Sequence, residues 1–125
     1  MTSRRKTSIS RPEGREHGSA ESADALDVLA KAMTEKELLQ AILDCARSLS
    51  WSCYHTWNSI HSPAGFPDLT LAGHGRVIFA ELKRENGKLT NAQREWITAL
   101  DEAGQDVHIW RPSDWLSGRI EEVLR

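Results

Sequence analysis

The stretch Val77-Ile78-Phe79-Ala80-Glu81-Leu82-Lys83 decides the fold, because it is the clearest β-strand in the chain and ends in charged residues. Side chains alternate between the two faces of a strand. The odd-numbered residues therefore share one face, on which Glu81 and Lys83 follow an apolar pair, and the even-numbered residues share the other. Burying such charges costs several kcal/mol unless they pair or bind a metal. The strand thus predicts a functional site at its end.

Asp68 supplies a second carboxylate near Glu81 in the predicted sheet. It begins a short strand, Asp68 to Ala72, which follows Gly65-Phe66-Pro67 and leads into the turn Gly73-His74-Gly75. A short turn joins antiparallel neighbours, so the two carboxylates should approach within a few Å. Adjacent carboxylates repel each other. Mg²⁺ or Mn²⁺, which prefer oxygen ligands, would remove that repulsion.

The chemistry that this set of residues predicts is phosphodiester hydrolysis. A divalent cation lowers the pKa of a bound water and polarises a phosphoryl oxygen. Lys83 would steady the attacking hydroxide or the negative charge that grows in the transition state. Asp68, Glu81 and Lys83 together therefore predict a metal-dependent site suited to phosphodiester hydrolysis.

The remaining patterns predict an α/β domain with the order α-β-β-β-α-β-α and a mixed central sheet flanked by helices. The first helix carries a capping-box spacing, Thr34 and Glu37, at which a helix starts or restarts. A second capping box begins the next helix at Thr90, and Gly104 ends it. The other predicted elements are a helix from Ala23 to Leu49, strands over Trp51 to Trp57 and Asp106 to Trp110, and a final helix from Pro112.

The composition fits one folded domain and a tail. The chain has 125 residues, and residues 1–22 are basic and nearly free of apolar side chains, which predicts a disordered arm. That arm is either a plain solvated tail or a source of sequence-independent phosphate contacts. Residues 23–125 form the predicted domain. The net charge of -2 neither favours nor opposes nucleic-acid binding, because metal ions offset acidic sites.

Two absences in the sequence predict where the protein works. No apolar run is long enough to cross a membrane, and the N-terminus lacks the apolar stretch of a secretory signal. We therefore expect an intracellular, cytoplasmic protein that makes no contact with a membrane. Cys45 and Cys53 are too few for a disulfide framework or a zinc site.

Pro67-Asp68, followed after twelve residues by Glu81-Leu82-Lys83, resembles the signature of the PD-(D/E)XK nuclease superfamily. The predicted element order is similar to the restriction-endonuclease-like core of that superfamily. More narrowly, roughly residues 34 to 124 resemble the VRR-NUC (virus-type replication-repair nuclease) domain. The segments that carry this likeness are Tyr54-His55-Thr56, Ser59, Gly65-Phe66-Pro67-Asp68-Leu69, Phe79-Ala80-Glu81-Leu82-Lys83, Gln93, Ala103-Gly104 and Trp110-Arg111-Pro112-Ser113-Asp114.

This resemblance implies a Mg²⁺-dependent DNA endonuclease. Stand-alone viral (phage) and bacterial members act on branched or structured DNA in replication, repair or recombination, often as homodimers. The likeness implies Asp68 and Glu81 as metal ligands, the main-chain oxygen of Leu82 as a further ligand, and Lys83 as the catalytic lysine. If the protein is viral, the host cytoplasm is its expected location.

The family also places a glutamate of the first helix near the metal, and the choice here lies between Glu35 and Glu37. Glu37 has a competing role as the capping-box partner of Thr34. That competition favours Glu35.

Four further residues are candidates for substrate contact: Gln93, His55, Ser59 and Lys88. Each has an ordinary alternative. Gln93 completes a capping box with Thr90, His55 and Ser59 fit a satisfied structural role, and Lys88 fits a solvated loop.

Two rival functions stay open at this point. One is a catalytically silent nucleic-acid-binding module of the same fold, which the intact set of Asp68, Glu81 and Lys83 disfavours. The other is a nuclease that acts on RNA, because contacts to a 2′-hydroxyl leave no motif in the sequence.

Overall fold

A mixed four-stranded sheet forms the centre of the domain in the computed structural model, which describes residues 20–56 and 61–125. The strands are β1 (Ser52–His55), β2 (Leu69–Gly73), β3 (Arg76–Leu82) and β4 (Asp106–Trp110), in the spatial order β1-β2-β3-β4. The first three strands are antiparallel neighbours, and β4 lies parallel to β3. The predicted α/β class and mixed central sheet are confirmed.

The helices follow the predicted order, but two of them are each divided in two. The observed helices are α1 (Ala20–Ala32), α2 (Glu35–Ser48), α3 (Asn91–Glu102), α4 (Pro112–Leu116) and α5 (Arg119–Leu124).

Local backbone chemistry explains both divisions. Thr34 is extended, and its hydroxyl accepts the amide of Glu37, so a new helix starts there as its capping box predicts. Gly118 has a φ of +84°, which ends the last predicted helix after one short segment and restarts it as α5. The helix expected from Ala23 already begins at Ala20.

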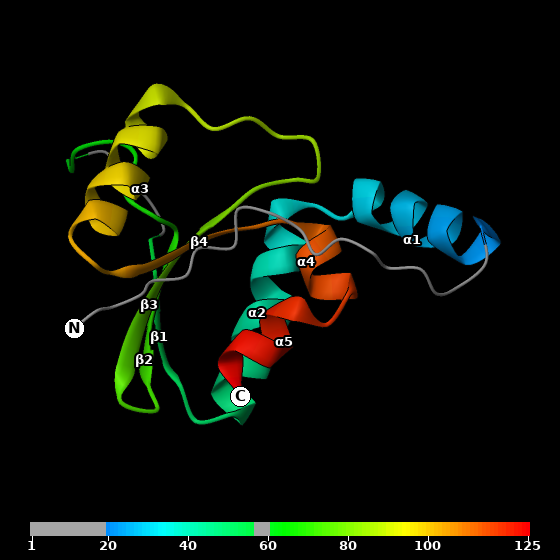
Figure 1. The fold of residues 1–125 in the computed structure, drawn as a ribbon, viewed down its shortest axis with the longest axis horizontal. Coiled ribbons are helices and arrows are strands. Elements are labelled where there is room, and N and C mark those ends of the chain that lie inside the picture. The colour runs from blue at the N-terminus through cyan, green and yellow to red at the C-terminus, as the bar shows by residue number, and fades with distance from the viewer. Residues whose placement is uncertain (1–19, 57–60) are drawn as a thin grey trace.

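Helices cover both faces of the sheet (Figure 1). On one face, Ile78, Ala80 and Leu82 of β3 pack with β2, α2 and α5 into the main core. On the other face lies α3, where the Phe66 ring meets Trp96 edge-on at a centroid separation of 5.0 Å and Phe79 edge-on at 5.9 Å. The predicted division of β3 into two faces therefore corresponds to two packed layers.

The first helix, α1, extends away from the sheet (Figure 1). Its Leu26, Val28 and Leu29 are exposed, whereas Ala30 is buried. Within the two described segments of the chain, no helix combines the length and the apolar character that crossing a membrane demands.

The loop that delivers Asp68 to the sheet is pressed against the start of α3. Gly65 has a φ of +98°, and a Cβ atom at this position would lie 2.5 Å from both the carbonyl carbon and the oxygen of Ala92. Only glycine fits this approach, because any side chain would collide with backbone as well as strain the left-handed conformation.

We predict that Gly65→Ala lowers the free energy of unfolding by roughly 2 to 4 kcal/mol, since collision and backbone strain add. Gly104→Ala is the matched control, because Gly104 has a similar φ of +81° with no atom near its missing Cβ. Strain alone should cost that variant about 1 kcal/mol. Urea unfolding of both variants measures the difference, and equal losses would contradict the close approach at Gly65.

Candidate active site

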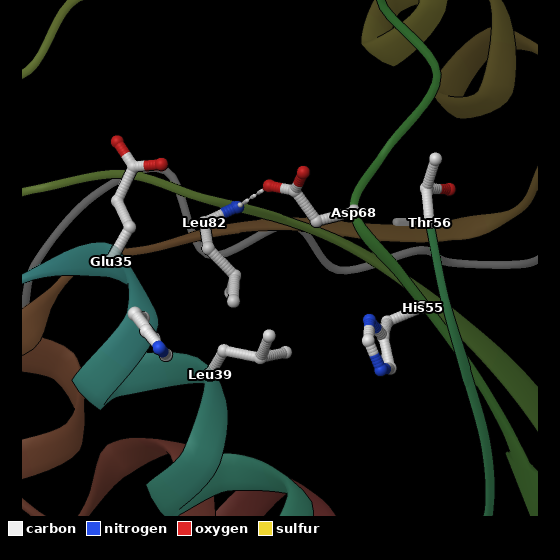
Figure 2. A pocket seen from close by; sticks show the side chains of 7 residues that line it. Glu35, Leu39, His55, Thr56, Asp68 and Leu82 are labelled. Atoms are coloured by element: carbon white, nitrogen blue, oxygen red, sulfur yellow. Dashed lines mark hydrogen bonds between the residues drawn. The ribbon is translucent and has the colours of Figure 1, made fainter. Parts of the chain in front are cut away.

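The register of β2 and β3 brings Asp68 and Glu81 together. Leu69 pairs with Ala80, so the residues just outside this pair, Asp68 and Glu81, are neighbours across the two strands. Asp68 precedes β2 by one residue, and its main-chain oxygen still accepts the amide of Thr56, which continues the ladder with β1. Its carboxylate Oδ2 accepts the amide of Leu82 at 2.9 Å (Figure 2). The Asp68 side chain is thus held against the backbone of β3.

Glu81 is a buried acid with incomplete hydrogen bonding. Only 2% of the residue is exposed, and its Oε1 atom has no hydrogen-bond partner among the described residues. The pKa of Glu81 is raised to about 8, mainly by burial and then by the negative charge of Asp68, and Lys83 partly offsets both effects. A cation beside this pair would complete the coordination of Oε1 and favour the ionised form. The two carboxylates therefore fit a hard divalent cation that keeps several waters.

Lys83 follows β3 directly, and its side chain lies with Glu81. Its amide donates to the main-chain oxygen of Trp110, which extends the β3–β4 ladder by one residue. The Nζ atom is 4.0 Å from Glu81 Oε2, and the side chain is 12% exposed. An ammonium this close to the carboxylates can stabilise negative charge at the site.

A guanidinium holds the loop that leaves Lys83. Arg111 Nη1 lies within hydrogen-bond distance of the carbonyl oxygens of Arg84 (2.8 Å), Glu85 (3.2 Å) and Gly87 (2.8 Å). The Glu85 carboxylate in turn accepts the amide of Ser113 at 3.0 Å. These contacts fix the end of β3 to the junction between β4 and α4. In the sequence Arg111 belongs to a segment that carries the family resemblance, but no pattern there assigns it a role in supporting the site.

The two glutamates of α2 occupy different environments. The carboxylate of Glu37 accepts the amide of Thr34 at 3.0 Å, so it completes the capping box. Glu35 lines a pocket together with Asp68, and its charge also raises the pKa of Glu81. Leu82 lies between Glu35 and Asp68 in Figure 2. Among residues 20–56 and 61–125, no three acidic, histidine or cysteine side chains are close enough together to hold one ion.

The remaining predicted residues are spread around this centre. His55 lines the same pocket as Glu35 and Asp68. Gln93 accepts the amide of Thr90 at 2.9 Å and therefore acts as a helix cap. Lys88 is exposed in the loop after β3. Ser59 and the predicted strand end at Trp57 lie outside the described residues, as do residues 1–19 of the predicted arm.

Three pocket residues have no counterpart among the predicted site residues: Lys36, Leu39 and Thr56. They come from α2 and from the residue after β1, and only the packing of these elements brings them together. Of the three, only Lys36 could have been noticed in the sequence, because a lysine in the first turn of a helix is disfavoured by the helix dipole.

Three comparisons relate this chain to known proteins. A model of the VRR-NUC domain family matches residues 14–113. A solved structure named "VRR_NUC domain" is 22% identical with a TM-score of 0.57, covering 71% of this chain and 97% of that one. Another, named "VRR_NUC domain protein", is 22% identical with a TM-score of 0.58, covering 74% and 88%. At this identity the structures show a shared fold. A search of curated protein sequences found no match.

The raised pKa of Glu81 predicts an unusual dependence of stability on pH when no cation is present. Between about pH 4.5 and about 8, the folded protein keeps a proton on Glu81 that the unfolded chain has lost. The free energy of unfolding should therefore fall as pH rises through this window, by a few kcal/mol.

Urea unfolding in EDTA across this pH range tests the effect. Glu81→Gln should lack this component and become more stable than wild type at the alkaline end. Glu37→Gln, which removes a charge elsewhere and keeps a capping side chain, should retain the wild-type slope. Parallel curves for wild type and Glu81→Gln would contradict the assignment.

Proposed function

We propose that this chain, which belongs to the VRR-NUC domain family of nuclease-type domains, is a metal-dependent endodeoxyribonuclease that hydrolyses phosphodiester bonds. The observation that carries the proposal is the buried Oε1 atom of Glu81, which has no hydrogen-bond partner in the described chain and lies beside Asp68. A site that served structure alone would have little use for such a costly pair of acids.

Asp68, Glu81 and the main-chain oxygen of Leu82 would hold Mg²⁺ or Mn²⁺. When bound, the cation would polarise the phosphoryl oxygen and lower the pKa of a bound water. Asp68 is already oriented by the amide of Leu82, so little rearrangement is needed at that ligand. Glu81 must lose its proton for cation binding, and the neighbouring Lys83 favours that loss.

The other residues of the site have roles toward the substrate. Lys83 would stabilise the negative charge that develops on the phosphoryl group. Glu35, on α2, would place its carboxylate at the edge of the metal site as an outer partner of the cation. His55, Lys88, Gln93 and Ser59 are proposed as contacts to the nucleic acid. Branched or structured DNA in replication, repair or recombination is the proposed substrate, and a homodimer in the cytoplasm is the proposed form.

The first test of this function is a cleavage assay. Purified protein with Mg²⁺ should cut branched DNA, and EDTA should abolish the cut. Lys83→Ala should lower the rate by about 10² or more, as loss of a transition-state donor does, and Asp68→Asn should do the same.

Plasmid, branched oligonucleotide and RNA are compared in the same assay. Circular dichroism of each variant controls for folding. Cleavage of RNA alone would identify a ribonuclease, and folded wild type that binds DNA without cutting it in Mg²⁺ or Mn²⁺ would identify a silent binding module.

The second test separates the two glutamates of α2. Glu35→Gln should lower the cleavage rate by about tenfold, the size of effect that outer partners of a metal site show. Glu37→Gln removes the same charge from the same helical turn but keeps the cap, so its rate should match wild type. Rates measured at saturating Mg²⁺ decide between them. A larger loss in Glu37→Gln than in Glu35→Gln would reverse the assignment.

A further inference from the structure

A pocket of about 140 Å³ opens beside Asp68 on the α2 side of the site. Its walls come from three parts of the fold: Lys36 and Leu39 of α2, His55 and Thr56 at the end of β1, and Leu82 of β3. Figure 2 shows Leu39 extending from α2 toward His55, with Leu82 and Asp68 on the neighbouring sides. We call this space the α2–β1 pocket.

The size and lining of the α2–β1 pocket suit a flat ring. Leu39 and Leu82 supply apolar walls, and Thr56 and His55 supply polar atoms around them. Small-molecule sites in proteins commonly have this mixture. A cavity of about 150 Å³ accepts benzene, which is a ring of the same size as a pyrimidine. The pocket of about 140 Å³ thus has room for one pyrimidine ring.

The charges at the pocket decide which part of a nucleotide enters it. Glu35 and Asp68 both line it, and the cation proposed to bind at Asp68 would hold the phosphate that is cleaved at that edge of the pocket. Lys36 also lines it, is exposed, and forms no ion pair with the described part of the chain. Away from that edge the apolar walls formed by Leu39 and Leu82 favour a neutral base, and the phosphate of the same nucleotide is favoured beside Lys36.

No contact among the described residues stabilises the positive charge of Lys36. It occupies the second position of α2, directly after Glu35, where the helix dipole disfavours positive charge. Residues that break a local rule without a structural gain are most often found at functional sites.

From these observations, we propose that the α2–β1 pocket binds the base of one unstacked pyrimidine nucleotide next to the phosphate that is cleaved, with Lys36 contacting the phosphate of that nucleotide. This inference rests on the proposed nuclease function and deepens it. A paired base would have to leave the duplex before it entered the pocket, which costs free energy, so a nucleotide that is already unpaired is the favoured substrate at this position.

The base-binding part is tested by affinity, independently of cleavage. Oligothymidylate and an abasic oligomer of the same length are titrated against the full chain in Ca²⁺ and followed by fluorescence anisotropy. Wild type should bind oligothymidylate about tenfold more tightly, since a bound base contributes on that scale. Leu39→Phe, which fills the pocket, should remove most of this preference.

Two further variants keep this test decisive. Thr56→Leu narrows the pocket from a half-exposed position, so it serves if Leu39→Phe does not fold. Tyr54→Ala is the control, because Tyr54 is 66% exposed on β1 and does not line the pocket. Equal affinity of wild type for both oligomers would overturn the proposal, and so would a preference that Tyr54→Ala abolishes and the pocket variants retain.

The phosphate contact of Lys36 is tested by the dependence of affinity on salt. Lys36→Ala should weaken oligothymidylate binding and reduce the slope of log K against log salt by about 1, which is the signature of one lost phosphate contact. Its thermal midpoint should not fall, because the substitution removes an unfavourable charge from the helix start. Lys31→Ala is the matched control, since Lys31 pairs with Asp27 on an exposed face of α1.

An unchanged salt slope for Lys36→Ala would overturn the assignment of Lys36. Failure of the nuclease function has a different signature. Wild type that shows the base preference and the Lys36 slope, yet cuts none of the substrates in Mg²⁺ or Mn²⁺, would contradict catalysis while supporting nucleotide binding in the pocket.

Discussion

Two carboxylates held side by side at the end of a buried sheet are the constraint on which the rest of this structure depends. The pairing of Leu69 with Ala80 fixes their separation, and the hydrogen bond from the Leu82 amide keeps Asp68 from turning away. Because Glu81 is buried, its charge cannot be relieved by water, and the response of the protein without a cation is a raised pKa. Ionising both acids is therefore unfavourable in the sheet, and a divalent cation would remove that penalty. Both side chains already lie where they could bind such a cation.

The layers on either side of the sheet keep that geometry rigid. On one face the main core packs α2 and α5 against Ile78, Ala80 and Leu82 of β3. On the other face Phe66, Phe79 and Trp96 tie the loop before Asp68 to α3. Gly65 lies against the backbone of Ala92 in the same layer. This close contact restricts the conformation of the loop that leads into β2. The backbone that carries Asp68 and Glu81 is thus packed on both faces of the sheet, which keeps the two acids in place.

How far the sequence predicts this arrangement depends on how local each feature is. The alternation of β3 and the turn at Gly73-His74-Gly75 are local, so the sheet and the closeness of Asp68 and Glu81 could be predicted. The capping box at Thr34 was also visible, and it assigned Glu37 to the helix start. The α2–β1 pocket could not be predicted, because its walls meet only after three elements have packed. The same is true of Arg111, which acts on a loop that is distant in the chain.

The grip of Arg111 on the loop after Lys83 has a consequence for sequence divergence. Its guanidinium reaches the main-chain oxygens of Arg84, Glu85 and Gly87, and these oxygens are present whatever side chains the loop carries. The loop is therefore free to vary at Arg84 without losing its anchor. Arg111 itself has no such freedom, because lysine has one small ammonium in place of a broad planar fork. We expect relatives of this chain to vary at Arg84 while keeping an arginine opposite the loop, because Arg111 binds only main-chain oxygens there. At Glu85 the side chain also holds the loop, through the Ser113 amide, so this position should vary less.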